Sequence, residues 1–157
     1  VQNIFKFDWG FDKMTLNIKK TGLEMVERAN SSEEQVFGSF YLSRLLGLNI
    51  SFKNNKCFVA FNSIPNLFNP QGTLHGGIIS TLMDISMGHL FEKEQLAGTT
   101  IELKTNFLLP IRTEKIICEG SYIKKGKTIS VMEAKLYRND KKLAAYSTST
   151  WKVFEKN

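Results

Sequence analysis

A carboxylate in an otherwise apolar segment is the feature of this sequence that points most directly to chemistry. Asp84 lies within ISTLMDISMGHLF, residues 79–91, where apolar residues recur at the spacing of a helix that is buried on nearly every side. A polar strip interrupts this surface, and it contains Gly77, Ser80, Thr81, Asp84 and Gly88 at intervals of three or four residues. Burying a carboxylate is costly unless something uses or satisfies it. Asp84 is therefore a candidate nucleophile or general base.

Two glycines open the predicted helix, and they favour a second chemical role. Gly76 and Gly77 each cost roughly 1 kcal/mol against Ala in a helix. Without Cβ atoms, however, the unpaired N–H groups of a first helical turn can closely approach an anion or a polarised carbonyl oxygen, which predicts an oxyanion hole. Asp84 follows Gly76 by about 12 Å along the helix axis, at 1.5 Å per residue. The two can act on one carbonyl only if they come from different chains.

The residues around these glycines resemble a known signature. The run GTLHGG from Gly72 to Gly77, with Asn69 before it and Asp84 after it, resembles the motif of the hotdog-fold acyl-coenzyme A thioesterases of the phenylacetate-degradation type. The resemblance covers roughly residues 35–153. It implies an α+β fold in which a five- or six-stranded antiparallel sheet wraps a long central helix, and a homodimer that is expected to pair into a homotetramer. It also implies hydrolysis of acyl-coenzyme A without a cofactor, since coenzyme A is part of the substrate.

The same resemblance assigns roles to five positions. Asp84 is implied to be the nucleophile or general base, and Gly76 the oxyanion donor. Asn69 is implied to lie near the thioester or the attacking water, while His75 orders the start of the helix. Thr100 occupies a position where relatives can have Ser, whose hydroxyl helps to place the water or the carboxylate. Thr keeps that hydroxyl but adds a methyl group.

A second set of residues is expected to bind the substrate. Gly77 and Thr81 belong to the polar strip of the helix, and Lys125, Gly126 and Lys127 form a basic turn that lies near the phosphates of coenzyme A in the resembled family. Lysines at turns are also commonly just solvated. Nucleic acid is not the expected partner, because stacking aromatics are sparse around this turn.

Alternative interpretations stay open at this stage. Asp84 could be a buried polar group bonded across a dimer interface, and His75 an ordinary structural hydrogen-bonder. His89 lacks a motif context and is expected to be a partly exposed polar residue. The whole protein could be a noncatalytic acyl-coenzyme A binder, or a hotdog-fold dehydratase or hydratase, although GTLHGG is not a motif of the latter. A serine hydrolase is not supported, because the chain contains no GxSxG sequence.

The remaining elements can be predicted from periodicity and turn residues. A helix is expected over about 13–28, and Ser31 with Glu34 forms a capping-box pattern for a second helix that ends at Gly47. We therefore expect an N-terminal extension over 1–32 and a hotdog domain over 33–157. Strands are expected at 48–52 and 57–61 before the central helix, and at 99–109, 114–124, 128–137 and 143–154 after it.

Composition sets the broad class of the protein. Its 157 residues, 42% of them hydrophobic, suit one globular core. The net charge of +6 favours a polyanionic partner such as coenzyme A without selecting among such partners. Cys57 and Cys118 are expected to be reduced core thiols of a cytoplasmic protein, with no metal-ligand spacing around them. No apolar run reaches the length of a membrane span, so no membrane partner is expected; the identity of the acyl group is left open.

Overall fold

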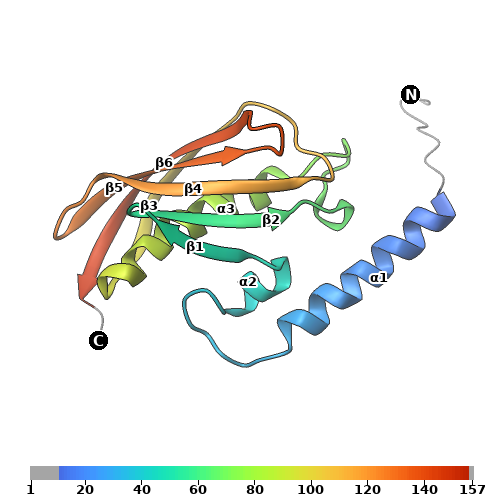
Figure 1. Cartoon of the computed structure of the whole chain (residues 1–157), viewed down its shortest axis with the longest axis horizontal. Helices are drawn as coiled ribbons and strands as arrows, with labels where there is room; N and C mark the ends of the chain where they lie inside the picture. The colour runs from blue at the N-terminus through green and yellow to red at the C-terminus, as the bar shows by residue number, and fades with distance from the viewer. Residues whose placement is uncertain (1–10, 156–157) are drawn as a thin grey trace.

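One helix, packed against the concave face of a curved antiparallel sheet, forms the centre of the molecule (Figure 1). The structure is a computed structural model that describes residues 11–155, with side chains from Asn17 onwards. The helix is α3, Gly76–Gly88, and the sheet order is β1-β2-β4-β5-β6-β3. The strands are β1 Asn49–Lys53, β2 Lys56–Asn62, β3 Leu96–Phe107, β4 Lys115–Lys124, β5 Ile129–Tyr137 and β6 Leu143–Glu155.

Alternation along the strands places the core between α3 and the sheet. In β2 the side chains of Cys57, Val59 and Phe61 are buried while their neighbours are more exposed, as expected for a sheet with one covered face. The approach of α3 to the sheet is very close at Gly120 of β4. A Cβ atom there would lie 2.4 Å from the Ser86 carbonyl oxygen, so only glycine permits this packing.

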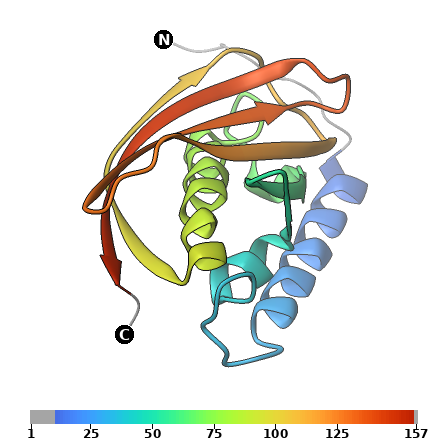
Figure 2. The ribbon, with the colours of Figure 1, turned by 60° about the vertical axis from the view of Figure 1, so that its left-hand side comes forward.

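The remaining elements lie at the ends and outside the sheet. Two 3₁₀ segments, η1 Pro65–Leu67 and η2 His89–Glu94, flank α3 on either side in sequence. The first helix, α1 Phe11–Ala29, runs outside the sheet beside the short α2, Tyr41–Leu46 (Figure 2). The Asn66 side chain ties η1 to α1 by donating a hydrogen bond to the Ile18 carbonyl oxygen at 2.6 Å.

The predicted fold class is confirmed: a six-stranded antiparallel sheet wraps a central helix, and a helix precedes that unit. The six strands and the first and central helices all lie close to their predicted ranges. Gly47 ends α2 in the left-handed conformation, with φ +66°, as its predicted role as a helix stop requires. The division at residue 32 stays a prediction, and residues 1–10 and 156–157 lie outside the described part of the chain.

The helix predicted to open at Ser31 is wrong. Residues 31–40 form a loop, and α2 begins only at Tyr41. The Arg44 guanidinium group explains the difference, because it donates hydrogen bonds to four backbone carbonyl oxygens, three of which lie within the predicted helix. They belong to Ala29, Ser32, Glu34 and Ser39, at 3.0, 2.6, 2.8 and 2.7 Å. These contacts with a charged donor outweigh a local capping pattern.

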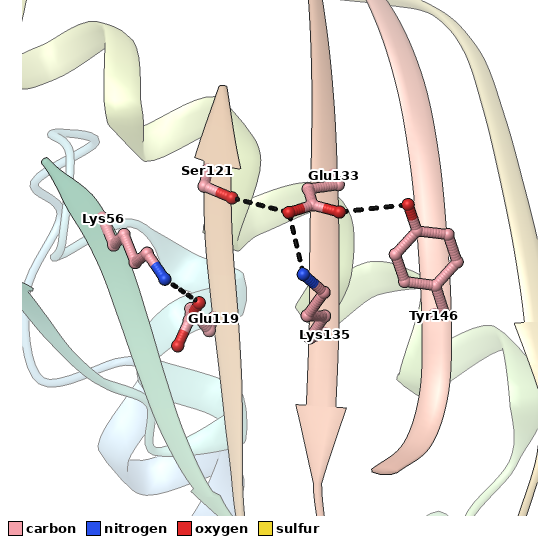
Figure 3. Close-up of polar contacts among 6 residues, drawn as sticks. All are labelled: Lys56, Glu119, Ser121, Glu133, Lys135 and Tyr146. Carbon is pink, nitrogen blue, oxygen red and sulfur yellow. Dashed lines mark hydrogen bonds and ion pairs between the residues drawn. The ribbon is translucent and has the colours of Figure 1, made fainter. Parts of the chain in front are cut away.

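The sheet face that points away from α3 carries paired polar groups (Figure 3). Glu133 accepts hydrogen bonds from Lys135, Tyr146 and Ser121, at 2.9, 3.0 and 3.3 Å. The pKa of this carboxyl is lowered, because these hydrogen bonds and the Lys135 charge outweigh its partial burial. Lys56 and Glu119 form a separate ion pair at 2.6 Å across β2 and β4.

Candidate active site

The start of α3 is shaped by the side chain of His75. His75 occupies the position before the first helical residue, and its Nδ1 accepts a hydrogen bond from the Gly77 N–H at 2.9 Å. This satisfies one of the N–H groups that a helix start leaves unpaired. Among the described residues, the Gly76 N–H has no hydrogen-bond acceptor. The first turn therefore presents the Gly76 N–H as a free donor, while the Gly77 N–H is occupied.

Asn69 organises the loop that leads into α3. Its Oδ1 accepts hydrogen bonds from the N–H groups of Gln71 and Thr73, at 3.0 and 3.2 Å, and its Nδ2 donates to Thr73 Oγ1 at 3.0 Å. Such contacts are typical of an Asx turn. Gly72, at φ +74°, completes the turn. In the single chain, the Asn69 side chain thus stabilises the loop that precedes Gly76.

Asp84 and Thr100 lie in direct contact. Thr100 Oγ1 donates a hydrogen bond to Asp84 Oδ1 at 2.8 Å. Partial burial raises the pKa of Asp84, and the hydrogen bond from Thr100 partly opposes that increase. The result is a carboxylate that is held in place by a hydroxyl group and is a stronger base than an ordinary Asp.

A bulge in β3 allows Thr100 to reach α3. Leu103 and Thr105 face inward, since Leu103 lines the cavity described below and Thr105 lies within hydrogen-bond distance of Ser80 on α3. By strict alternation Thr100 would point outward. The pairing of β3 with β6 slips between Thr100 and Glu102, which leaves Ile101 as an extra residue and reverses the facing of the strand before it.

Asp84 lines a cavity of about 690 Å³ between α3 and the loop before α2. Thr81 and Ile85 flank Asp84 on the same helix, and the rest of the lining is mainly apolar and aromatic. The lining residues are Gln35, Val36, Phe37, Phe40, Leu42, Ser80, Thr81, Asp84, Ile85, Gly88, His89, Gly98, Leu103 and Trp151. The volume and the mostly apolar lining are typical of a small-molecule site.

His89 is buried, so its predicted partial exposure is wrong. Its side chain is only 4% exposed, and it contributes to the cavity lining. Its Nε2 accepts a hydrogen bond from the Gly38 N–H at 2.9 Å, and its Nδ1 lies 2.9 Å from the Ile85 carbonyl oxygen. The sequence carried no local signal for this, because Gly38 lies far from His89 along the chain.

The basic turn lies at a second, separate cavity. Lys125, Gly126 and Lys127 line a space of about 480 Å³ together with the ends of β3 and β6. Lys125 forms an ion pair with Glu94 on η2, whereas Lys127 is exposed and has no ion-pair partner in the described residues. Gly126 is required by the turn, because a Cβ atom there would lie 2.1 Å from the Ile129 carbonyl oxygen.

The predicted site residues thus form three groups in a single chain. Asp84, Thr100 and Thr81 gather at the large cavity, while Asn69, His75, Gly76 and Gly77 gather at the start of α3. The basic turn is the third group. Sequence reasoning missed other residues that line the large cavity: Gln35, Val36, Phe37 and Phe40 in the loop before α2, Leu42 in α2, His89 and Trp151. Among the described residues, no cluster of potential metal ligands is present, and none of the described helices is long and apolar enough to cross a membrane.

Comparison with known sequences and structures points to one superfamily. A sequence profile of the thioesterase superfamily matches residues 71–145. The chain is 37% identical over 84 residues to a candidate esterase of Saccharolobus solfataricus, covering 52% of this chain and 60% of that protein. The chain thus spans about three fifths of the length of that relative. It is also 26% identical over 131 residues to the medium/long-chain acyl-CoA thioesterase YigI of Salmonella typhimurium, covering 71% and 84% of the two chains.

A solved structure extends the similarity to nearly the whole chain. The crystal structure of the BH2602 protein from Bacillus halodurans with CoA superposes with a TM-score of 0.77 at 20% identity. The match covers 98% of this chain and 100% of that one. At this level of identity, the match shows a shared fold.

Proposed function

We propose that this chain is a hotdog-fold thioesterase that hydrolyses acyl-coenzyme A thioesters to a free acid and coenzyme A, a proposal supported by the thioesterase-superfamily profile that matches residues 71–145. The observation that carries the proposal is the pairing of Asp84 with Thr100 at the edge of a mostly apolar cavity. A carboxylate held by one hydroxyl and otherwise partly desolvated suits a general base or a nucleophile. The apolar lining suits the acyl group of the substrate.

The chemical step uses Asp84 in one of two ways. As a general base it takes a proton from water, and the water oxygen attacks the thioester carbonyl carbon; as a nucleophile it attacks that carbon itself and water then releases the acyl group. In both cases the carbon–sulfur bond breaks and the coenzyme A sulfur leaves with the electron pair and then takes a proton. The negative charge that develops on the carbonyl oxygen is stabilised by the Gly76 N–H.

A homodimer is part of this proposal. Gly76 and Asp84 lie at opposite ends of a stretch of α3 about 12 Å long, so one carbonyl cannot contact both groups of a single chain. The Gly76 N–H of one subunit would serve the Asp84 of the other. Pairing of such dimers into a homotetramer remains a prediction.

The substrate class follows from the cavity and from the relatives. Coenzyme A is present in the Bacillus halodurans structure, and the Salmonella typhimurium relative is named for medium/long-chain acyl-CoA. The large, mainly apolar cavity beside Asp84 supports an acyl group longer than acetyl. Lys127, and Lys125 where it is released from Glu94, would meet the phosphates of coenzyme A. The buried, unpaired thiols of Cys57 and Cys118 support a reducing compartment such as the cytoplasm.

The dehydratase alternative is less well supported. That chemistry needs a His and an acidic group that can both exchange protons with the substrate. His89 and Asp84 do line one cavity, but both ring nitrogens of His89 are engaged by backbone groups of Gly38 and Ile85. A noncatalytic binder is distinguished from an enzyme by the experiment below.

Free thiol release from acetyl-, butyryl-, decanoyl-, palmitoyl- and phenylacetyl-coenzyme A tests the proposed function. We expect release by the wild-type protein and a loss of roughly 10²-fold or more in kcat for Asp84→Asn, whose amide is nearly isosteric but cannot act as a base. Binding of substrate by Asp84→Asn should persist. Release by a well-folded Asp84→Asn protein at the wild-type rate would contradict the role of Asp84. Binding without release of any thioester by the wild type would identify a noncatalytic binder.

A further inference from the structure

His89 connects the loop before α2 to the central helix. The ring lies at the end of α3, where Nδ1 contacts the Ile85 carbonyl oxygen at 2.9 Å. On its other side, Nε2 accepts a hydrogen bond from the Gly38 N–H at 2.9 Å. Because Nε2 accepts, the ring proton of neutral His89 must be on Nδ1, where it is donated to Ile85. A neutral imidazole is therefore the form that satisfies both backbone groups.

The loop that His89 contacts is also held by α2, where the Ser43 hydroxyl donates a hydrogen bond to the Gly38 carbonyl oxygen at 3.2 Å. Residues 36–39 form a turn in which the Ser39 N–H donates to the Val36 carbonyl oxygen at 3.0 Å, and Gly38 takes the left-handed conformation, with φ +79°. A Cβ atom at Gly38 would touch nothing within 4 Å, so the turn does not pack tightly around this residue. Arg44 binds the loop on one side, and His89 binds it on the side of the cavity.

The aromatic residues of this turn rest on His89. The Phe37 ring meets the His89 ring edge to face, with centroids 5.2 Å apart, and the Phe40 ring lies at 6.0 Å. Phe37, Phe40 and His89 all line the cavity that contains Asp84. His89, which is 4% exposed, thus links this wall to α3. The adjacent lining residues Ile85 and Trp151 are also buried, at 8% and 4% exposure.

We propose that His89 is a positioning residue for chain-length selection: by holding the turn of residues 36–39 against α3, it fixes the wall of the acyl cavity that longer acyl chains contact. The proposal rests on the proposed thioesterase function, and it assigns to the loop of residues 35–40 the role of the acyl-binding wall. On this proposal, longer acyl groups contact the wall more extensively than an acetyl group does. Each methylene that contacts the wall favours binding by about fourfold.

Two substitutions separate the hydrogen bond to Gly38 from the other properties of His89. The side chain of His89→Gln can place an acceptor oxygen near the position of Nε2, and it therefore keeps the contact with Gly38. The side chain of His89→Asn can keep a donor near the position of Nδ1 but is too short to reach Gly38. Both replacements are polar and close in size, so each controls for the other.

The measurement is kcat and KM for acetyl- and decanoyl-coenzyme A. Because the wall contacts are the same in the ground state and the transition state, we expect His89→Asn to raise KM for decanoyl-coenzyme A roughly tenfold, the equivalent of between one and two methylene contacts, with kcat nearly unchanged. The increase in KM for acetyl-coenzyme A should be smaller, so the ratio of kcat/KM for decanoyl- to acetyl-coenzyme A should fall. His89→Gln should retain the wild-type ratio of kcat/KM for the two substrates. An unchanged ratio in His89→Asn, or an equal loss in both variants, would overturn the proposal.

A second measurement uses the wild-type protein and does not depend on how the variants fold. Burial lowers the pKa of His89, so the neutral ring persists into mildly acidic solution. Protonation would place a donor at Nε2 opposite the Gly38 N–H, and the ratio of decanoyl to acetyl kcat/KM should then fall with decreasing pH. The hydrogen bond to the Ile85 carbonyl oxygen and the charge of Glu92 partly oppose this lowering, and Asp84, which lines the same cavity, affects both substrates equally and cancels in the ratio. A ratio that stays constant while NMR shows the His89 ring taking up a proton would overturn the proposal.

These outcomes are distinct from failure of the proposed function. The wild type could hydrolyse both thioesters while the ratio of kcat/KM for decanoyl- to acetyl-coenzyme A changes neither in His89→Asn nor with pH. In that case only the proposed role of His89 is wrong. If the wild type hydrolyses neither, the affinity of decanoyl-coenzyme A for the wild type, His89→Gln and His89→Asn, measured by calorimetry, still tests the wall. A roughly tenfold weaker affinity in His89→Asn alone would support the role of His89, and equal affinities in all three proteins would overturn it.

Discussion

At the scale of single residues, the Asp84 carboxyl is balanced between burial and one hydrogen bond. Burial raises its pKa, while the hydroxyl of Thr100 stabilises the ionised form and lowers the pKa. A raised pKa also has a cost in stability. Because the folded protein binds a proton to Asp84 more readily than the unfolded chain does, ionisation of Asp84 lowers the free energy of unfolding as pH rises through its folded pKa. Asp84 thus resembles functional groups that are retained at the expense of stability.

Removal of the Thr100 hydroxyl tests this balance. Thr100→Val keeps the shape of the side chain but removes the donor, so the pKa of Asp84 should rise further. Since the ionised carboxylate is the active form, the acidic limb of the pH profile of kcat/KM should move to higher pH. Thr100→Ser keeps the hydroxyl and is the matched control. An acidic limb that does not move in Thr100→Val would show that the hydroxyl does not tune Asp84.

At the scale of elements, the sequence predicted the helices and strands that local residue patterns determine. The period of α3, the glycines at its start and the alternation of the strands are all local, and these elements lie close to their predicted ranges. The loop of residues 31–40 could not be predicted, because it is held by Arg44 and His89 rather than by its own capping residues. The bulge at Ile101 is a product of the pairing of β3 with β6, so the inward orientation of Thr100 was implied only by the family resemblance.

The turn between β4 and β5 gives a prediction at the same scale. Lys127 is exposed at the second cavity, whereas Lys125 is paired with Glu94. Lys127→Ala should therefore raise KM for acyl-coenzyme A several-fold while kcat stays nearly unchanged, because phosphate contacts are equal in ground and transition states. The effect should shrink with added salt and be absent for a short acyl-pantetheine. Lys115→Ala, at an exposed residue of β4, is the control. Equal effects on both substrates would mean that Lys127 does not bind phosphate.

At the scale of the whole molecule, the arrangement of the sheet leaves one long strand unpaired on its outer side. β3 is an edge strand of the sheet, and within residues 11–155 it pairs with β6 alone. Ile101, Phe107 and Leu108, in and just after this strand, are more than half exposed. Long exposed edges with apolar side chains are normally covered in native proteins. A second copy that joins its sheet along β3 would cover this edge and is consistent with the proposed dimer.

Complementation between two inactive variants tests the shared site. Gly76→Pro removes the proposed donor at the first helical position, where Pro is tolerated, and His75 already has the extended backbone that a following Pro requires, with φ −60° and ψ 134°. Mixed with Asp84→Asn, it should form heterodimers with one intact site, so random pairing in equal amounts should restore roughly a quarter of the wild-type activity. Gly76→Ala, which retains the N–H but adds a Cβ atom 3.3 Å from the Phe107 ring, is the control and should keep more activity than Gly76→Pro. If heterodimers confirmed by mass stay inactive while Gly76→Ala is active, the two groups do not serve one carbonyl across the dimer.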